Sequence, residues 1–264
     1  MPLVTLSERV VVITGASTGI GAETARRASA EGALVVLTSR RRAELEAIAS
    51  QCTSPTLVVV ADVTKRADVE RVAAEALQRF GHFDVWINNV GRGVTRLPSE
   101  LTDEDIDSMV EVNVKTALYG TQVALTHFRT RGTDQTQVIN ISSTLGRVPN
   151  VVYRAAYSAS KHFLNALTAN FRDEMAATHP NILITTVSPG LVFTEFGVNA
   201  LHGGVDSRAL RGVAPGQEVE SVAATILHAM RTGAHDVYTA RGARRRMLDY
   251  LGALAQDPPA NLSF

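Results

Sequence analysis

The sequence predicts an α/β fold: a single-domain, doubly wound parallel sheet of Rossmann-like type with helices on both faces. Short β-branched runs alternate with helical patterns along almost all of the 264 residues, which is the order that repeated β-α-β units produce. The runs are continuously apolar, as expected of strands that helices cover on both sides. With 45% hydrophobic residues and no linker or repeat, the chain can bury one core. We therefore expect residues 1–264 to form one domain with a variable tail over about 243–264.

Seven runs are expected to be strands, in the order Val10–Thr14, Leu34–Thr38, Leu57–Val60, Val85–Asn88, Val138–Ile141, Ile182–Val187 and Asp236–Thr239. Apolar residues from Val69 to Phe80 recur at the i, i+3, i+4 spacing of an amphipathic helix. Another helix is expected to begin at Thr102, because three acidic residues follow it in the first turn. Residues 190–216 are rich in glycine and lack periodicity, and such an insert in a compact domain often forms a lid or binding loop.

Charge and cysteine content disfavour several classes of protein. The 26 basic and 26 acidic residues balance, so we expect no nucleic-acid partner and no attraction to an anionic membrane. Cys52 is the only cysteine, so no intrachain disulfide or cysteine-based metal cluster is possible, and we expect no metal. The first residues show no secretory signal, and no stretch reaches the ~20 apolar residues of a membrane span. A soluble cytoplasmic protein is the expectation.

A glycine-rich turn, Thr14-Gly15-Ala16-Ser17-Thr18-Gly19-Ile20-Gly21, follows the first strand. In doubly wound sheets, ligands bind beyond the carboxyl ends of the strands. Glycines let the backbone approach a pyrophosphate closely, and the start of the next helix presents free N–H groups to that anion. The turn therefore predicts a dinucleotide phosphate site, and a tight turn without a ligand is the alternative.

A second motif, Tyr157-Ser158-Ala159-Ser160-Lys161, places a phenol and an ammonium on one helix face, because residues i and i+4 are neighbours there. The adjacent ammonium is expected to lower the pKa of the Tyr157 phenol. Ser143 follows the fifth strand and can place a hydroxyl opposite the tyrosine, with Ser142 as its competitor. Asn113 lies inside a helical pattern, where asparagine is locally unfavourable, and this indicates another role.

Together these motifs resemble the short-chain dehydrogenase/reductase family, whose glycine motif reads Thr-Gly-x-x-x-Gly-Ile-Gly, over approximately residues 8–235. On that resemblance, Asn113, Ser143, Tyr157 and Lys161 correspond to the family's catalytic asparagine, serine, tyrosine and lysine. The resemblance implies hydride transfer between nicotinamide and a carbonyl or secondary alcohol, with Tyr157 as general acid or base. Ser143 would hold the substrate oxygen, Lys161 the nicotinamide ribose, and Asn113 a water.

The resemblance also implies which residues contact the cofactor. Asp62 and Val63 would contact adenine, and a cap on the following helix is the alternative role of Asp62. Residues 88–91, Asn-Asn-Val-Gly, resemble the family's Asn-Asn-Ala-Gly, and residues 189–194 resemble its Pro-Gly-x-Val-x-Thr, which would hold the carboxamide. The expected cofactor residues are Gly15, Ser17, Thr18, Gly19, Ile20, Gly21, Ser39, Arg40, Arg41, Asp62, Val63, Asn89, Val90, Gly91, Tyr157, Lys161, Pro189, Gly190, Val192 and Thr194.

The end of the second strand distinguishes the two nicotinamide cofactors. An acidic residue there binds the ribose 2′-hydroxyl of NAD, whereas a basic residue accommodates the 2′-phosphate of NADP. Here Ser39, Arg40 and Arg41 follow one another, with no carboxylate before Glu44. Arg40 can form charge-assisted bonds with a phosphate, so we expect NADP (NADPH) rather than NAD. Arginines that merely cap an exposed loop are the alternative.

The substrate is expected to be a small, partly apolar carbonyl compound or alcohol, and the residues expected to line its site are Ser143, Val151, Tyr153, Phe193 and Phe196. Arg92 or Arg96 is a candidate partner for a substrate carboxylate. Two other functions remain open, namely epimerase or dehydratase chemistry on the same scaffold and NADP(H) sensing without turnover. The sensor is disfavoured because binding NADP requires neither Ser143 nor Tyr157.

The C-terminal part departs from the family pattern, because Arg241-Gly242-Ala243-Arg244 follows the last strand where many members have Val-Asp-Gly-Gly. A homo-dimer or homo-tetramer is expected, but the tetramer geometry associated with the common tail does not carry over. Leu248, Leu251 and Leu254 have helical spacing, so this segment is expected to cover a subunit surface or the edge of the active site.

Overall fold

Seven apolar runs pair as one parallel sheet in the order β3-β2-β1-β4-β5-β6-β7. The computed structural model describes residues 4–254. The strands are β1 (Val10–Thr14), β2 (Leu34–Ser39), β3 (Thr56–Val60), β4 (Val85–Asn88), β5 (Thr136–Ile141), β6 (Ile182–Ser188) and β7 (Asp236–Tyr238). Each expected strand is present, with ends that differ by at most about two residues. The predicted doubly wound α/β fold is confirmed.

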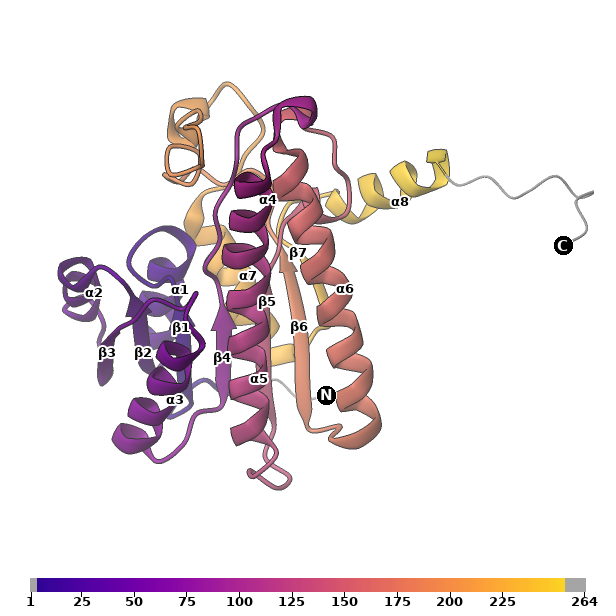
Figure 1. Ribbon diagram of the computed structural model, residues 1–264. Coiled ribbons are helices and arrows are strands. Elements are labelled where there is room, and N and C mark those ends of the chain that lie inside the picture. The colour runs from indigo at the N-terminus through magenta and orange to yellow at the C-terminus, as the bar shows by residue number, and fades with distance from the viewer. Residues whose placement is uncertain (1–3, 255–264) are drawn as a thin grey trace, which may run out of the picture.

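Helices cover both faces of the sheet (Figure 1). They are α1 (Gly19–Ala30), α2 (Arg42–Ala49), α3 (Arg66–Phe80), α4 (Asp103–Val110), α5 (Thr116–Phe128), α6 (Ala155–Thr178), α7 (Val219–Thr232) and α8 (Ala243–Leu254). Alternate side chains of β1 enter different cores. Val11 and Ile13 pack with α1 and α7, whereas Val10 and Val12 pack with α3 and α5. This two-sided burial is why the strand sequences are continuously apolar.

The order of the strands reverses beside β1, which pairs with β2 on one side and with β4 on the other. Successive β-α-β units therefore leave β1 in opposite directions, and the loops that follow β1 and β4 lie next to each other. In open α/β sheets this switch point is where ligands bind. The topology thus brings the glycine turn after β1 close to residues 89–91 after β4.

The helix that was expected to begin at Thr102 does so. The Thr102 hydroxyl accepts a hydrogen bond from the Asp105 backbone N–H at 3.3 Å, and the Asp105 carboxylate accepts one from the Thr102 N–H at 3.2 Å. This reciprocal capping box starts α4. A five-residue π-helix, η2 (Glu111–Lys115), then joins α4 to α5, so Asn113 lies in a π-helical turn rather than in ordinary α-helix. Single π turns occur frequently at functional sites.

The glycine-rich insert between β6 and α7 is irregular, as expected, apart from the short 3-10 helix η5 (Ser207–Leu210) and single bridges from Val94 to Leu201 and from Val192 to Gln217. Helix α8 extends sideways from the body of the molecule (Figure 1), and its leucines Leu248, Leu251 and Leu254 are exposed in this chain. Within residues 4–254, no helix has the length and apolar character needed to cross a membrane.

Candidate active site

The glycine turn forms a close-packed cradle at the start of α1. Gly15 has a φ of 67°, which favours glycine, and a side-chain carbon on Gly21 would collide with the Gly15 carbonyl oxygen. Thr18, the N-cap residue of α1, makes no side-chain cap bond, and the first turn holds no acidic residue. The first N–H groups of α1 therefore remain available, at the positive end of the helix dipole. These features fit the phosphates of a dinucleotide.

Asn89 joins this cradle to the end of β4. Its side-chain amide donates to the carbonyl oxygens of Thr14 at 3.1 Å and Gly15 at 3.2 Å. The Val90 side chain also packs here, because a side-chain carbon on Gly15 would lie 3.2 Å from it. On the other wall, a side-chain carbon on Gly19 would lie 3.5 Å from the Thr194 methyl group. Three segments that are distant in sequence thus meet around the turn.

Arg41 lies over the glycine turn. Its guanidinium donates to the Ser17 hydroxyl at 2.8 Å and to the Thr18 hydroxyl at 3.1 Å, and its backbone N–H donates to the Ser39 hydroxyl at 3.1 Å. Arg40 is exposed and has no hydrogen bond or ion pair within residues 4–254. The sequence interpretation gave Arg40 the leading role and Arg41 a secondary one. The structure places the charge of Arg41, not that of Arg40, beside the turn.

Asp62 and Val63 follow β3. The Asp62 carboxylate accepts bonds from the Thr64 N–H at 3.2 Å and from the Thr64 hydroxyl at 2.9 Å, and its own N–H donates to Asp68 at 2.7 Å. The N-cap residue of α3 is Lys65. Asp62 therefore shapes the turn that precedes the helix and does not cap the helix. Val63 is buried.

The segment after β6 has its polar groups paired. The Pro189 carbonyl accepts from the Thr144 N–H at 2.8 Å, and the Gly190 N–H donates to Gln217 at 3.3 Å. The Thr194 hydroxyl accepts from the Phe196 N–H at 3.3 Å and so keeps its own proton for donation. The residues of this loop that are expected to contact nicotinamide are therefore held by hydrogen bonds to Thr144 and to Gln217.

The four residues Asn113, Ser143, Tyr157 and Lys161 come from η2, the end of β5 and α6, and all four are buried. A side-chain carbon on Gly91 would lie 3.2 Å from the Asn113 amide oxygen and 3.4 Å from Lys161 Nζ. Lys161 Nζ donates to the Ile141 carbonyl at 2.9 Å, at the end of the strand that leads to Ser143. The fold thus gathers these four residues near Gly91, at the carboxyl ends of β4 and β5.

Asn113 is held firmly by its neighbours. Its amide oxygen accepts from the Arg92 N–H at 2.8 Å, and its amide nitrogen donates to the Arg92 carbonyl at 2.9 Å and to the Ser160 hydroxyl at 3.0 Å. Ser160 in turn donates to the Tyr157 carbonyl at 2.7 Å. Asn113 therefore ties the loop after β4 to the first turns of α6, which carry Tyr157 and Lys161.

The titration of this pair differs from the sequence prediction. Burial raises the pKa of Tyr157 to about 12, although the Ser143 hydroxyl and the Arg154 guanidinium act in the opposite direction. Burial also lowers the pKa of Lys161 to about 8. The phenol pKa was expected to be lowered by Lys161, but it is raised, because burial has the largest effect and Lys161 is not among the groups that act on it. Lys161 Nζ lies 5.9 Å from the centre of the Tyr157 ring.

The family assignment agrees with this geometry. The family model for short chain dehydrogenases matches residues 9–202, a span that includes the glycine turn and all four of the gathered residues. The chain belongs to the short-chain dehydrogenase/reductase family. The family uses NAD or NADP, and the chain is therefore an oxidoreductase with a nicotinamide cofactor.

Named relatives and solved structures of this family are similar to the chain over most of its length. The uncharacterized oxidoreductase YxnA of Bacillus subtilis is 32% identical over 252 residues, which cover 94% of this chain and 69% of that protein. The monensin polyketide synthase putative ketoacyl reductase of Streptomyces virginiae is 34% identical over 200 residues, 75% of this chain and 76% of that protein.

One solved structure is a short-chain dehydrogenase/reductase from Burkholderia phymatum in complex with NAD, which superimposes with a TM-score of 0.86. The match covers 99% of this chain and 100% of that chain at 20% sequence identity, and it shows the shared fold. A mutant of a Serratia marcescens short-chain dehydrogenase/reductase has a TM-score of 0.77 at 27% identity and covers 89% of this chain and 97% of its own.

The expected substrate residues of this short-chain dehydrogenase/reductase do not lie together. Phe196 packs against Tyr157, with ring centres 5.5 Å apart. Phe193 instead packs against Gly216 and under Arg211, whose guanidinium lies 5.2 Å from the Phe193 ring centre. Of the expected aromatic side chains, Phe196 is the one in contact with Tyr157.

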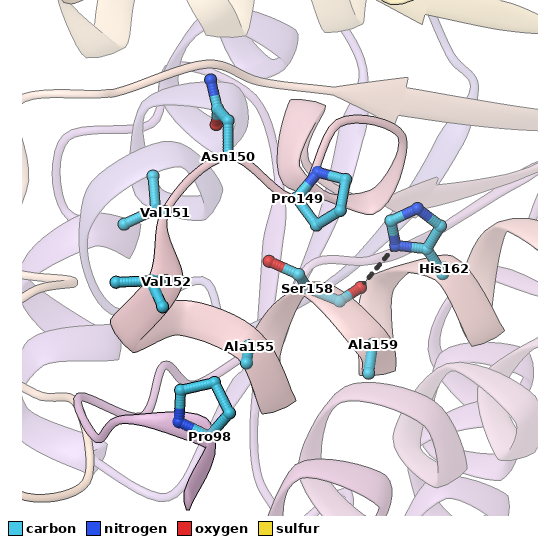
Figure 2. A pocket seen from close by; sticks show the side chains of 9 residues that line it. All are labelled: Pro98, Pro149, Asn150, Val151, Val152, Ala155, Ser158, Ala159 and His162. Atoms are coloured by element: carbon cyan, nitrogen blue, oxygen red, sulfur yellow. Dashed lines mark hydrogen bonds between the residues drawn. The ribbon is translucent and has the colours of Figure 1, made fainter. Parts of the chain in front are cut away.

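Val151 lines a separate pocket of about 580 Å³ on a neighbouring face of α6 (Figure 2). Ser158, Ala159 and His162 contribute to its wall, whereas Tyr157 and Lys161 do not. Tyr153 is exposed. The structure therefore does not bring Val151 and Tyr153 to the four gathered residues in the way that the sequence interpretation expected.

The arginines that were expected to bind a substrate carboxylate are engaged differently in the structure. Arg96 forms an ion pair with buried Asp105 at 3.0 Å, so its charge is already neutralised. Arg92 is exposed and donates to the Asn199 carbonyl at 3.2 Å. Sequence reasoning missed Arg154, whose guanidinium is close enough to Tyr157 to influence its titration. Its position three residues before Tyr157, at the start of the same helix, was the available signal.

Proposed function

We propose that the protein is an NADP(H)-dependent oxidoreductase that transfers hydride between nicotinamide and a carbonyl or secondary alcohol substrate, with Tyr157 as general acid or base. The carrying observation is the buried Tyr157 phenol beside Ser143 and Lys161, at the carboxyl edge of the sheet next to Gly91. A buried phenol whose neighbour is the Ser143 hydroxyl suits proton transfer to an oxygen bound between the two.

The chain fits NADP(H) at several points. The uncapped start of α1 and the glycine cradle suit the pyrophosphate. Arg41 is well placed to donate charge-assisted hydrogen bonds to the 2′-phosphate, with the Ser39 hydroxyl beside it. Gly91 leaves room for the nicotinamide ribose next to Lys161. When bound, NADPH supplies the hydride.

The remaining chemistry belongs to the chain. With its pKa at about 12, Tyr157 is protonated at neutral pH and can donate its proton to the carbonyl oxygen during reduction. The Ser143 hydroxyl, which accepts from the Leu145 N–H at 3.1 Å, has its own proton free to hold the same oxygen. Lys161 carries positive charge below about pH 8 and stabilises negative charge near the phenol. Asn113 positions the loop and the helix around them.

The decisive experiment is a panel of ketones with NADPH or NADH, followed by loss of reduced-cofactor absorbance. Stoichiometric NADPH oxidation that requires a ketone supports the proposal. Epimerase or dehydratase chemistry would instead convert substrate without net cofactor oxidation, and a sensor would bind NADPH without turnover. Faster turnover with NADH would contradict the NADP assignment.

Two further properties remain predictions. A homo-dimer or homo-tetramer is proposed from the family resemblance, and light scattering during size-exclusion chromatography measures it directly. The cytoplasmic location is a proposal from the sequence, in which no secretory signal was recognised, and fractionation of the source cells would test it.

A further inference from the structure

We propose that Arg154 binds a carboxylate of the substrate, so that the preferred substrates are oxo acids and hydroxy acids rather than neutral ketones and alcohols. This inference rests on the proposed function and specifies its substrate class. Three observations support it: the position of Arg154 near Tyr157, the space that two glycines leave for its guanidinium, and the absence of an acidic partner within the described residues.

Arg154 lies at the mouth of the site. It is the N-cap residue of α6, the helix that presents Tyr157 one turn later. Phe196 is a neighbour of both side chains. Its ring centre is 5.5 Å from that of Tyr157, and a side-chain carbon on Gly93 would meet both the Phe196 ring at 3.3 Å and the Arg154 guanidinium. The Arg154 guanidinium is close enough to influence the titration of Tyr157, so it can reach a charged group on a molecule whose oxygen is bound at Tyr157.

Two glycines make room for the guanidinium. A side-chain carbon on Gly93 would collide with Arg154 Nη1, and one on Gly204 would lie 3.1 Å from Nη2. Gly93 belongs to the loop after β4, and Gly204 to the irregular insert after β6. The arginine thus occupies a space bounded by two active-site loops rather than pointing into solvent.

The charge of Arg154 lacks an acidic partner. No Asp or Glu within residues 4–254 forms an ion pair with it, and its one recorded hydrogen bond is from Nη1 to the Val94 carbonyl at 3.3 Å. Two other part-buried arginines are paired, Arg96 with Asp105 at 3.0 Å and Arg131 with Asp84 at 3.1 Å, whereas Arg9, which lies far from the site, donates to the Gln135 carbonyl and has no ion pair within residues 4–254. A part-buried guanidinium with donors to spare favours an anionic ligand, because an unpaired buried charge is costly.

A carboxylate is the anion that fits best. The planar guanidinium binds carboxylates through two parallel hydrogen bonds, which confers orientation as well as affinity. The phosphates of the cofactor are accounted for elsewhere, at the glycine turn and Arg41. Burial lowers the pKa of Arg154, and the nearby hydroxyls of Tyr153 and Tyr157 are the groups that oppose this effect. The negative charge of a bound carboxylate would offset the cost of burying the Arg154 guanidinium.

The test compares 2-, 3- and 4-oxooctanoate with their methyl esters, so that the spacing between the ketone and the charge is also varied. For at least one pair, wild-type kcat/KM should favour the acid by about ten- to a hundredfold, the range of a charge-assisted hydrogen bond. Arg154→Met should raise KM for the acid, so that the ratio of kcat/KM between acid and ester falls to about one. The kcat/KM for the ester should stay nearly unchanged. Arg154→Lys should retain part of the preference.

Arg92→Met is the matched control, because it removes an exposed arginine near the same loop. It should keep the acid preference. Equal rates for acids and esters in the wild type, an unchanged ratio in Arg154→Met, or loss of the ratio in Arg92→Met would each overturn the inference. Loss of ester turnover in Arg154→Met at unchanged melting temperature would do the same, since it would indicate a role in the chemistry itself.

A binding measurement separates this inference from the proposed function. Calorimetry with octanoate and octanamide, in the presence of NADPH, does not depend on turnover. Octanoate should bind wild type more tightly than octanamide, and Arg154→Met should remove the difference. If no ketone is reduced but this difference is present, the proposed reaction fails while the carboxylate site stands. If octanoate and octanamide bind alike, the carboxylate site fails even where neutral ketones are reduced.

Discussion

Tyr157 and Lys161 illustrate how burial sets chemistry at the scale of single residues. Both side chains are almost fully buried, and burial disfavours the charged form of each. The phenol pKa therefore rises to about 12, whereas the ammonium pKa falls to about 8. At neutral pH the pair consists of a neutral phenol and a charged ammonium. That state is suited to donating a proton during carbonyl reduction.

Removal of the phenol hydroxyl tests this assignment. Tyr157→Phe should lower kcat by roughly 10²–10⁴-fold, the usual contribution of a general acid. NADPH affinity, measured by fluorescence titration, should stay nearly constant because the proposed phosphate site is the glycine turn and Arg41, not Tyr157. A variant that keeps more than about a tenth of wild-type kcat, a loss below ~1.4 kcal/mol, would exclude Tyr157 as the main acid.

The pH dependence of ketone reduction should follow Lys161. Its pKa is lowered from the ordinary value of 10.5 to about 8, so the ammonium is present below pH 8 and lost above it. Tyr157 keeps its proton throughout this range. We expect kcat/KM for reduction to be flat below about pH 8 and to decline above it. Lys161→Arg, which stays charged, should lose this decline, and Lys161→Met should be slow at every pH. A wild-type rate that rises from pH 8 to 9 would contradict this role.

At the scale of the element, the loop between β2 and α2 is expected to set the choice between NADP and NAD. Arg40 and Arg41 occupy this loop, Arg42 is the first residue of α2, and the surroundings of the three differ. Arg41 reaches Ser17 and Thr18, Arg40 is exposed, and Arg42 points outward to Glu46 at 3.4 Å. Because side chains of successive residues leave a loop in different directions, one of the three is placed to meet a phosphate at the glycine turn.

Alanine substitutions in this loop should therefore differ in effect. Arg41→Ala should reduce the preference for NADPH over NADH, measured as the ratio of kcat/KM values, by about ten- to a hundredfold. Arg40→Ala should have a smaller effect, and Arg42→Ala, the matched control, none. Ser39→Asp combined with Arg41→Ala should reverse the preference, since the new carboxylate repels phosphate and accepts from a free 2′-hydroxyl. A wild type that prefers NADH would refute the assignment.

The irregular insert after β6 is expected to act as a lid over 193–211. Some of its bonds are internal, since the Ser207 hydroxyl donates to the Thr194 carbonyl and Arg208 pairs with Glu195 at 2.8 Å. Others join it to neighbouring segments, such as those from the Leu201 N–H to the Gly93 carbonyl and from the Thr95 hydroxyl to the Gly203 carbonyl. Phe196 is its contact with Tyr157. Hydrogen exchange in this segment should be faster than in the strands and should slow when cofactor and substrate bind. Slow exchange that neither ligand alters would indicate a rigid wall instead.

At the scale of the whole molecule, cofactor binding should increase the free energy of unfolding. A ligand that binds only the folded chain at a hundred times its Kd stabilises it by about 2.7 kcal/mol. If NADH binds tenfold more weakly, it contributes ~1.4 kcal/mol less at the same concentration. We expect NADPH to raise the melting temperature by a few degrees more than NADH in thermal shift assays, and Arg41→Ala to remove the difference. Equal shifts in wild type would argue against NADP preference.

The sequence by itself determined the architecture and the family. Continuous apolar runs such as Val10–Thr14 predict buried parallel strands, because helices cover both faces and no polar alternation is needed. The Thr102 capping box likewise follows from local hydrogen-bonding preferences. The glycine turn and the Tyr157–Lys161 spacing carry the family resemblance. All of these signals lie within a few consecutive residues.

Other features were decided only by the tertiary structure. Whether Arg40 or Arg41 reaches the glycine turn, and whether Phe193 or Phe196 packs on Tyr157, depends on how loops distant in sequence come together. The raised pKa of Tyr157 depends on burial by the whole fold, which no neighbour in sequence reports. The isolation of Arg154 from carboxylates likewise depends on the long-range placement of Gly93 and Gly204. Propensity and spacing act locally along the chain, whereas desolvation and charge pairing act through space, and so they are defined only once the chain has folded.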